Sequence, residues 1–493
     1  MSKPIVSDSL EPPAAAALLR LLPAVGVLAE QPDDAARSMP AALRMLLARE
    51  AIAATRTKIR SGQLALPELV GPDCRSQWTE RLELVSVPSL RPVLNGLGVL
   101  LHTNAGRAPL PEAALQAVSA ATSGYNALEL QIATGKRGSR QDHCRPLLRW
   151  LTGAEDALVV NNGAAAVLLA LKALAAGRPV VVSRGELVEI GGGFRIPDVL
   201  AASGAQLCEV GTTNRTHLRD YQKELERLQQ QGTPAAAVLQ VHRSNFAIVG
   251  FETHPQLAEL AGLARSYGAA TIVDLGSGAL RQLPIQPADL PDGSSSEPEP
   301  TLTEVLLAGA DAVTCSGDKL IGGPQSGLIL GSRAALATMH TDPLARALRC
   351  GSLVLSALQE VLRLHLLDRA DELPALAQLH ISEYEIGVLA EQWALILQGL
   401  LPPGWLVGVV AATAQVGGGT HPLLVLPSRA LSLTKVGQTA EHLSEIMRHA
   451  PVPVLARPRD AAVLLDVRSL RAGQGQRSDE ALLALIAVAA SGA

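Results

Sequence analysis

The sequence is poor in aromatic residues and cysteines, and it has no long uninterrupted apolar run. Aromatic side chains make up 2% of the 493 residues, so aliphatic side chains must supply most of a core. The five cysteines lie far apart without a CxxC motif, which argues against a disulfide framework or a zinc site and favours the cytoplasm. We therefore expect no metal site. We expect no signal peptide, because Met1-Ser2-Lys3-Pro4 leads into Ser, Asp, Glu and Pro rather than an apolar segment. We expect no membrane span, because no run of about 18 apolar residues occurs.

Charge of one sign is also missing, since 42 Lys and Arg oppose 46 Asp and Glu to give a net charge of −4. This balance excludes a wholly basic nucleic-acid-binding protein but leaves room for a local basic patch. Hydrophobic residues make up 48% of the chain. The length is enough for two to four domains at roughly 100–200 residues each.

The first 70 residues predict a helical domain with a basic stripe. One helix should begin near Pro40 and end near Arg60. On it Arg49, Arg56 and Arg60 are spaced seven and four apart, so they share one side of the helix. A solvated helix face explains this stripe as well as a ligand contact does.

Beyond the predicted helical domain the chain reads as a linker over 71–90, a large domain over 91–340 and a small α/β domain over 341–493. The large domain alternates short β-rich runs with helical runs, which predicts a mainly parallel sheet with helices on both faces. Six buried strands are expected, around 158–160, 180–182, 237–239, 271–273, 312–314 and 328–330. Residues 291–300 read as a low-complexity surface insert, and residues 480–490 as a helical tail.

Three segments of the large domain carry candidate chemistry. Asn162, Gly163 and Ala164 form a strand-to-helix turn whose backbone N–H groups can receive a phosphate. Asp274 follows a buried strand, where α/β sheets place their ligands, and an acid there can pair with a pyridinium nitrogen. Lys319 lies in a glycine-flanked turn, from which its amine can form a Schiff base.

Each segment alone has an ordinary structural explanation: a turn, a helix cap and an exposed lysine. The order of phosphate turn, strand-end Asp and Gly-flanked Lys is that of the pyridoxal-phosphate enzymes with the aspartate-aminotransferase-like fold. The run Ser-Gly-Asp-Lys-Leu-Ile-Gly-Gly-Pro-Gln over 316–325 resembles the Schiff-base signature of the bacterial selenocysteine synthase family, the L-seryl-tRNA(Sec) selenium transferases. Further matching segments are 95–98, 102–107, 135–140, 184–190, 194–198, 209–216, 241–242 and 244–245.

The resemblance implies a fold-type I pyridoxal-phosphate enzyme with a mainly parallel, seven-stranded type of sheet. It implies conversion of seryl-tRNA(Sec) to selenocysteinyl-tRNA(Sec), by β-elimination to an aminoacrylyl group and addition of selenium from selenophosphate. Lys319 would hold pyridoxal 5'-phosphate and act as the base, and Asp274 would keep the ring protonated. The N-terminal helical domain would bind tRNA, and the subunits would form a homo-oligomer of dimers, expected to be a larger ring.

Further site residues follow from the resemblance. Arg107, Arg346 and Arg349 would bind selenophosphate, the last two as an i, i+3 pair if helical. His242 would lie over the cofactor ring and Ser316 would reach its phosphate. The stripe Arg49, Arg56 and Arg60 would contact the tRNA backbone. Surface arginines with ordinary ion pairs, and a core histidine, are the plainer interpretations.

The sequence departs from the family pattern at several positions. Gly163 stands where a third Asn is typical, Phe246 replaces a Tyr, Cys315 precedes the Schiff-base signature, and 130–133 lacks the expected aromatic and acidic residues. Two alternative functions stay open. One is a pyridoxal-phosphate lyase acting on a small amino acid or amino sugar, and the other is a non-catalytic tRNA-binding protein.

Overall fold

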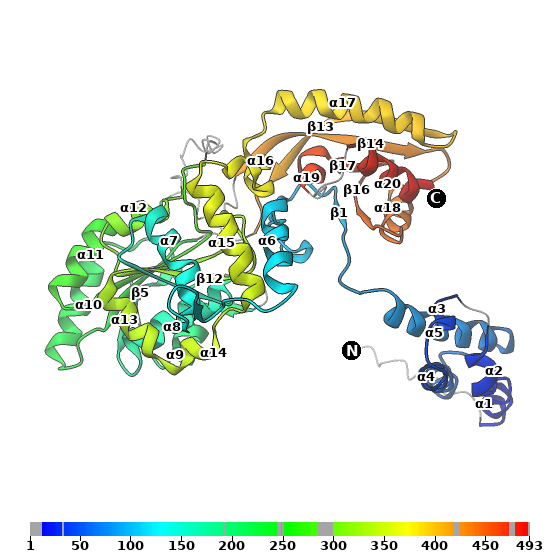
Figure 1. The fold of residues 1–493 in the computed structure, drawn as a ribbon, viewed down its shortest axis with the longest axis horizontal. Coiled ribbons are helices and arrows are strands. Elements are labelled where there is room, and N and C mark those ends of the chain that lie inside the picture. Colours follow the sequence, from blue (N-terminus) through cyan, green and yellow to red (C-terminus); the bar gives the residue numbers. More distant parts are fainter. Residues whose placement is uncertain are drawn as a thin grey trace, which may run out of the picture. The chain divides into compact units, whose positions relative to one another are not determined.

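The computed structural model divides into two compact units, Met1–Pro92 and Val93–Ala493 (Figure 1). The structure describes residues 12–31, 34–190, 193–243, 248, 251–283, 299–418, 420, 424–472 and 479–491. Within these ranges no helix is both long enough and apolar enough to span a bilayer.

The first unit is helical, as predicted. Its helices are α1 (Pro12–Leu19), α2 (Val25–Ala29), α3 (Asp34–Arg37), α4 (Ala41–Arg60) and α5 (Pro67–Ser86). Helix α4 starts directly after Pro40, so the predicted bounds are confirmed. Its buried side includes Leu47, Ala51 and Ile52, which pack in one cluster with Trp78 of α5.

Helix α5 occupies most of the segment that the sequence predicted to be a linker. The Gly71-Pro72 pair suggested a break, yet the helix continues through it to Ser86. Val70, Cys74, Trp78 and Leu82 recur every four residues, and all are at most 1% exposed. Burial of this apolar stripe outweighs the hydrogen bond that Pro72 removes. The linker prediction is therefore wrong for residues 71–86.

The second unit is built around a seven-stranded sheet of order β4-β12-β11-β10-β9-β5-β8. Its strands are β4 (Asp156–Val160), β5 (Pro179–Ser183), β8 (Gln206–Val210), β9 (Ala237–Val241), β10 (Ala270–Gly276), β11 (Ala312–Ser316) and β12 (Gly327–Gly331). Only β12 runs antiparallel to its neighbours, so the mainly parallel sheet is confirmed. The six predicted strands all form, and β8 is an additional edge strand.

Both faces of this sheet are covered, as its strands require. Alternate residues of β4 enter different clusters: Leu158 and Val160 pack with α8 and α9, whereas Ala157 and Val159 pack with α7 and α15. The helices of this part are α6 (Glu112–Thr122), α7 (Arg145–Thr152), α8 (Gly163–Ala175), α9 (Ile196–Ser203), α10 (Leu218–Gln230), α11 (Leu257–Ser266), α12 (Leu302–Leu307), α13 (Arg333–Thr341), α14 (Pro343–Ala347) and α15 (Ser352–Leu366).

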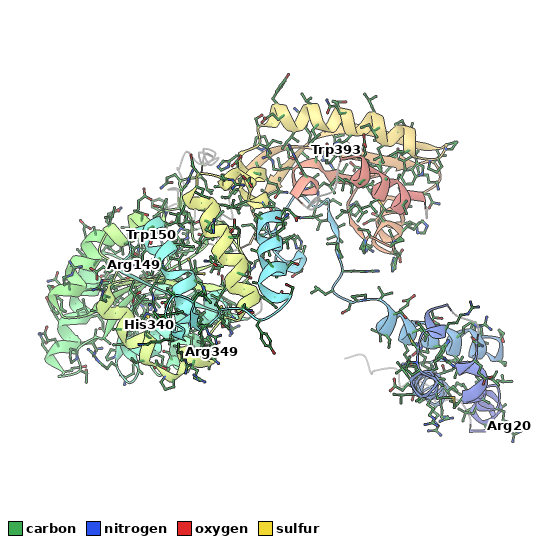
Figure 2. The ribbon with its side chains drawn as sticks, viewed as in Figure 1. Arg20, Arg149, Trp150, His340, Arg349 and Trp393 are labelled. Carbon is green, nitrogen blue, oxygen red and sulfur yellow. The ribbon has the colours of Figure 1, made fainter. Side chains whose placement is uncertain are left out.

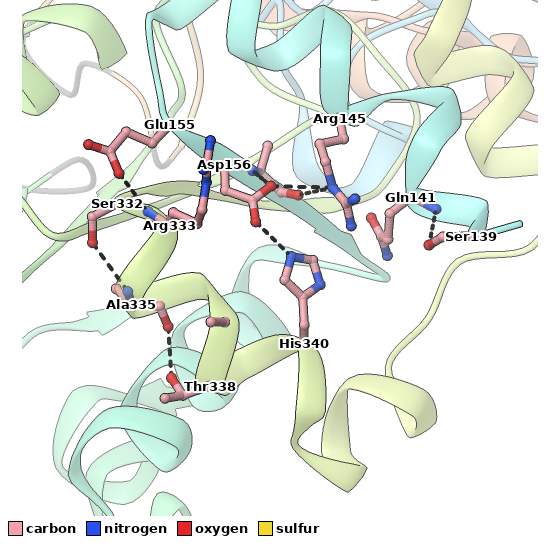
Figure 3. Close-up of polar contacts among 12 residues, drawn as sticks. Ser139, Gln141, Arg145, Glu155, Asp156, Ser332, Arg333, Ala335, Thr338 and His340 are labelled. Atoms are coloured by element: carbon pink, nitrogen blue, oxygen red, sulfur yellow. Dashed lines mark hydrogen bonds and ion pairs between the residues drawn. The ribbon is translucent and has the colours of Figure 1, made fainter.

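Polar side chains protect β4, which is an edge strand of the sheet. The buried Gln141 amide bonds both backbone groups of Val159, at 2.9 Å to its oxygen and 2.8 Å from its nitrogen. At the start of the strand, Asp156 lies between Arg145 of α7 and His340 of α13, at 3.3 and 3.1 Å (Figure 3). These contacts satisfy an edge that would otherwise be open to pairing with another chain.

The C-terminal part forms a second sheet of order β13-β14-β17-β16. Its strands are β13 (Trp405–Gln415), β14 (Val425–Lys435), β16 (Arg457–Arg459) and β17 (Ala462–Asp466), and its helices are α16 (Pro374–His380), α17 (Glu383–Leu400), α18 (Ala440–Arg448), α19 (Val467–Ala472) and α20 (Asp479–Ser491). Trp393 of α17 is buried in its core (Figure 2) and donates a 3.0 Å hydrogen bond to Asp479. The C-terminal part therefore combines strands with helices, and its last described helix is α20.

The two cores do not divide at residue 341. Helix α15 lies beyond that residue but packs in the core of the large sheet. Leu94 lies before it and packs in the core of the small sheet, where β1 (Leu94–Asn95) pairs with β15 (Val454–Leu455). Ala414 of β13 and Leu426 of β14 also pack in the core of the large sheet. The chain therefore passes between the two cores several times, and the predicted boundary does not coincide with their division.

Replacing Trp78 by Ala tests whether α5 belongs to the helical core. We expect the opening free energy of the α5 amides to fall by about 3–5 kcal/mol, because a fully buried indole is lost. Hydrogen exchange of residues 67–86 in the full chain measures this value. Leu84→Ala in the same helix removes a side chain that is 75% exposed and should cost within about 0.5 kcal/mol. Equal effects of both substitutions would contradict the packing.

Candidate active site

The candidate residues meet where three strands end at one edge of the large sheet. Gly327, the first residue of β12, pairs with Val160 on one side and with Ser316 on the other. The ends of β4 and β11 therefore flank one residue. On β10, Asp274 pairs with Thr314 of β11. Ligands of open α/β sheets bind at such carboxyl edges.

The turn after β4 has the backbone geometry that suits an anion. Asn162 caps helix α8, because its Oδ1 accepts a 2.8 Å hydrogen bond from the Ala165 N–H. Gly163 begins the helix, and Ala164 follows it in the first turn, where backbone N–H groups lack helical partners. A Cβ at Gly163 would lie 2.5 Å from the Ser316 hydroxyl oxygen. The departure at Gly163 thus lets Ser316 approach the helix terminus.

Asp274 is 6% exposed, and its carboxylate is held in place. The Thr314 hydroxyl donates a 2.9 Å hydrogen bond to its Oδ1. Burial raises the pKa of Asp274, while the Thr314 hydrogen bond and the nearby Lys319 oppose this rise. A buried carboxylate of this kind gains from a cationic partner.

Lys319 is an unusual cation, because the residue is only 4% exposed. Burial lowers the pKa of Lys319, and the positive charge of Arg107 lowers it further. Asp274, Asp318 and Glu299 act in the opposite direction. A lowered pKa increases the fraction of neutral amine, which is the form that attacks a carbonyl.

Arg107 joins this site through Asp318, the residue before Lys319. Its Nη1 lies 3.1 Å from each carboxylate oxygen of Asp318. Arg107 adopts a left-handed backbone conformation with φ of 62°, which is costly for a residue with a Cβ. Arg107, one of the three arginines predicted to bind selenophosphate, therefore lies beside Lys319.

Arg349 is positioned near the site by backbone contacts of its own segment. It forms an isolated bridge with Val160, and the Asn161 N–H donates to the neighbouring Leu348 oxygen at 2.9 Å. Arg349 is thus held beside the phosphate turn. Its guanidinium lies 3.5 Å from Glu129.

Arg346 and Arg349 do not form the helical pair that their spacing suggested. Helix α14 ends at Ala347, so the two residues share no helix face. Arg346 is exposed. No hydrogen bond or ion pair among the described residues links either arginine to Arg107.

His242 follows β9 directly and lies beside Asp274. Its backbone N–H donates a 2.9 Å hydrogen bond to the backbone carbonyl oxygen of Asp274. Among the other departures, Cys315 is buried in β11, where burial raises the pKa of its thiol. Phe246 and the segment 244–245 lie outside the described residues.

Several acidic residues of this region were not singled out from the sequence. Glu129 contacts three arginines: Arg140 at 2.6 Å, Arg137 at 2.9 Å and Arg349 at 3.5 Å. Hydrogen bonds from Arg140 and then Arg137 lower the pKa of Glu129. Both arginines stand in the matching segment 135–140, but nothing local to that segment indicates their shared partner.

The sequence predicts Glu299 to lie in a surface insert, and that prediction is wrong for this residue. Its side chain is 3% exposed, and burial raises its pKa well above the ordinary value, an effect that Lys319 opposes. Residues 291–298 of the predicted insert lie outside the described part. Glu299 therefore belongs to the surroundings of Lys319 rather than to the surface.

The arginine stripe of α4 belongs to the first unit. Arg49, Arg56 and Arg60 are exposed, and no ion pair among the described residues includes them. The two other basic residues of the helix are used internally. Arg44 donates to the Met39 oxygen at 2.8 Å, and Lys58 pairs with Asp73 at 2.6 Å.

Comparison with known proteins assigns the chain to a family. The family model described as "L-seryl-tRNA selenium transferase" matches residues 93–471. The chain belongs to the L-seryl-tRNA selenium transferase family. It is 46% identical over 391 residues to the L-seryl-tRNA(Sec) selenium transferase of Geotalea daltonii, covering 79% of this chain and 82% of the relative. It is 43% identical over 473 residues to that of Moorella thermoacetica, covering 94% and 96%.

Membership of the selenium transferase family agrees with the fold. The solved structure of D-glucosaminate-6-phosphate ammonia-lyase aligns with a TM-score of 0.54 and 18% identity, covering 82% of this chain and 96% of that one. At this identity the likeness concerns the fold alone. The expected fold class of the fold-type I pyridoxal-phosphate enzymes is confirmed.

The residues at the carboxyl edge fit pyridoxal phosphate, the cofactor of this transferase family. The helix terminus at Gly163 and the Ser316 hydroxyl suit a phosphate. The buried Asp274 suits a pyridinium nitrogen, and the buried Lys319 amine suits the aldehyde. When bound, the cofactor supplies an electron sink for a carbanion at the substrate Cα.

Substituting Arg107 by Met tests the electrostatics around Lys319. Loss of the positive charge, together with release of Asp318, should raise the pKa of Lys319 toward the ordinary 10.5. The rate at which cofactor-free protein attaches pyridoxal phosphate should then reach its half-maximum at a higher pH. Absorbance spectroscopy over a pH series measures this shift. Arg137→Met, which removes a largely exposed arginine, is the control, and a downward shift for Arg107→Met would refute the assignment.

Proposed function

We propose that this chain converts L-seryl-tRNA(Sec) to L-selenocysteinyl-tRNA(Sec), with pyridoxal phosphate as cofactor and selenophosphate as selenium donor. The observation that carries this proposal is the buried amine of Lys319 beside Asp274, in a chain 46% identical to a selenium transferase. The non-catalytic alternative loses support, because a tRNA-binding protein has no use for a buried lysine at a sheet edge.

The roles of the protein groups follow from their positions. Neutral Lys319 takes the proton from the Cα of the seryl group and can return it after selenium has added. Asp274, fixed by Thr314, stabilises positive charge on the cofactor ring. The first turn of α8 and Ser316 hold the phosphate. The burial of Lys319 and Asp274 limits access of water to the reacting centre.

Selenophosphate is an anion, and we assign its binding to Arg107, Arg346 and Arg349. Arg107 is anchored beside Lys319, and Arg349 is anchored beside the phosphate turn. Guanidinium groups suit this ligand because they donate paired hydrogen bonds to phosphoryl oxygens. Arg346 is exposed and can approach an anion without giving up an ion pair among the described residues.

The first unit is assigned to tRNA binding. The stripe Arg49, Arg56 and Arg60 presents three exposed positive charges on the rigid helix α4. Such contacts to phosphates position a nucleic acid and read no bases. We also expect a homo-oligomer built from dimers, because Tyr125, Ile132 and Trp150 expose large apolar side chains.

The decisive experiment is turnover of seryl-tRNA(Sec) with pyridoxal phosphate and selenophosphate. We expect selenocysteinyl-tRNA as the product. Lys319→Ala should abolish turnover and the borohydride-trapped cofactor adduct, because it removes the amine that reacts with the aldehyde. A yellow, folded protein without product would favour the small-molecule lyase, and trapping that survives Lys319→Ala would refute Lys319.

Neutralising the α4 stripe tests the tRNA assignment. Arg49, Arg56 and Arg60 replaced together by Gln should weaken tRNA binding and reduce its dependence on salt, by about one in slope for each phosphate that is no longer neutralised. Binding is measured at several salt concentrations, with cofactor content as a check of folding. The matched control replaces Arg149, Arg219 and Lys223, which are exposed residues of the second unit. Equal reductions in both variants would show only a general charge effect and would overturn the assignment.

A further inference from the structure

Strands β5 and β9 separate before they reach the site. Their parallel pairing ends with Val182 opposite Leu239. Strand β5 then stops at Ser183 and turns into the short helix η3 (Arg184–Glu186), whereas β9 continues to Val241. Among the described residues, no strand therefore neighbours the last residues of β9 on that side, and a buried backbone N–H there needs another acceptor.

The side chain of Glu186 supplies that acceptor. Its Oε2 accepts a 3.0 Å hydrogen bond from the Val241 N–H, and the residue is only 7% exposed. The turn that carries it is itself pinned, because the Ser183 hydroxyl lies 2.7 Å from that of Thr216 and accepts from the Gly185 N–H. One carboxylate oxygen thus takes the place of the missing strand.

The backbone segment fixed by Glu186 is the one that carries His242. On its other side Val241 pairs with Asp274, and the backbone N–H of His242 donates to the backbone carbonyl oxygen of Asp274 at 2.9 Å. The end of β9 is therefore held between Glu186 and the strand of the ring-binding aspartate. Without the Glu186 hydrogen bond the backbone of Val241 would keep its pairing with β10 but lose the contact on its other side, so the direction of the neighbouring His242 side chain would be less defined.

Placing a carboxyl at this position is costly. Burial raises the pKa of Glu186 to about 7, an effect that the Val241 hydrogen bond and Arg243 oppose. A serine or an amide could also accept one N–H, and neither would carry a desolvated charge. Buried ionisable groups with strongly shifted titration gather at functional sites, and the hydrogen-bond partner of Glu186, Val241, directly precedes a proposed cofactor contact.

We propose that Glu186 is a positioning residue, whose side-chain oxygen fixes the end of β9 and thereby aims His242 at the ring of the bound cofactor. This inference rests on the proposed function, specifically on the place of His242 over the ring. It adds a residue that contacts neither cofactor nor substrate and acts through the backbone of its neighbour.

A double-substitution cycle tests the inference in the full chain. Glu186→Met keeps the volume but removes the acceptor, and Glu186→Gln restores an acceptor oxygen. The readouts are the dissociation constant for pyridoxal phosphate and the visible circular dichroism of the bound cofactor. We expect Glu186→Met to weaken binding about tenfold, the size of one ordering hydrogen bond, and to change the dichroism. Glu186→Gln should remain near the wild-type value.

The cycle is completed with His242→Ala. If Glu186 acts through His242, then Glu186→Met should add nothing to the weakening already caused by His242→Ala. Glu189→Ala, which removes an exposed acid in the same segment, is the control. Additive effects, or a Glu186→Met protein that binds like wild type, would overturn the inference.

Two outcomes separate this inference from the proposed function. A His242→Ala protein with unchanged affinity and dichroism would overturn the inference, while Lys319 trapping and turnover would stand. If borohydride trapped no cofactor adduct in the wild-type protein, the proposed function would be overturned instead. Thermal unfolding of each cofactor-free variant shows whether it folds. Glu186→Gln and Glu186→Met carry side chains of similar size, so the comparison between them isolates the effect of the acceptor oxygen.

Discussion

The desolvation of Lys319 is the constraint on which the organisation of the site depends. An amine that is 4% exposed cannot carry its charge as readily as one in water, and the neutral form gains. The protein does not leave the amine in an apolar pocket, however. Asp274, Asp318 and Glu299 favour the ammonium form, while Arg107 disfavours it. A lysine that must both attack a carbonyl and carry a proton needs both forms to be accessible.

The parallel sheet explains how residues far apart in sequence surround that amine. Val160, Asp274 and Ser316 end or nearly end their strands, and all three strands run in the same direction. A single glycine, Gly327, separates the ends of β4 and β11. A Cβ at that residue would lie 2.0 Å from the backbone oxygen of Asn162. No larger residue at this position would therefore let the phosphate turn lie this close to β12. The anion site and the lysine turn are therefore coupled by one backbone contact.

Much of this arrangement could be predicted from the sequence, because its signals are local. Six strands were found because each is a short apolar run buried on both faces. Strand β8 was missed because it is an edge strand whose sequence, Gln-Leu-Cys-Glu-Val, alternates with polar residues. Helix α5 was missed because Gly71 and Pro72 indicate a break, whereas its four-residue apolar repeat needs a partner helix to have meaning.

The site residues also divide into those that local sequence motifs reveal and those that only the fold reveals. Lys319, Asp274 and the turn at Asn162 stand in recognisable local motifs, so their sequence predictions named residues that the fold brings together. Glu186 and Glu129 act on partners 55 and up to 220 residues away, and no pattern within one segment reveals such contacts. Glu299 was hidden by the acidic and proline-rich composition before it, although the residue itself is buried.

Two of the three arginines proposed to bind selenophosphate, Arg107 and Arg349, show how cationic side chains can be oriented before a ligand binds. Asp318 holds Arg107 and Glu129 holds Arg349, each at a distance that allows a charge-assisted contact. Glu129 also contacts Arg137 and Arg140, so one negative charge is shared among three positive ones. Such a cluster keeps a surplus of positive charge beside the phosphate turn. An arriving anion would therefore be attracted by guanidinium groups that are already oriented, and little side-chain entropy remains to be lost when it binds.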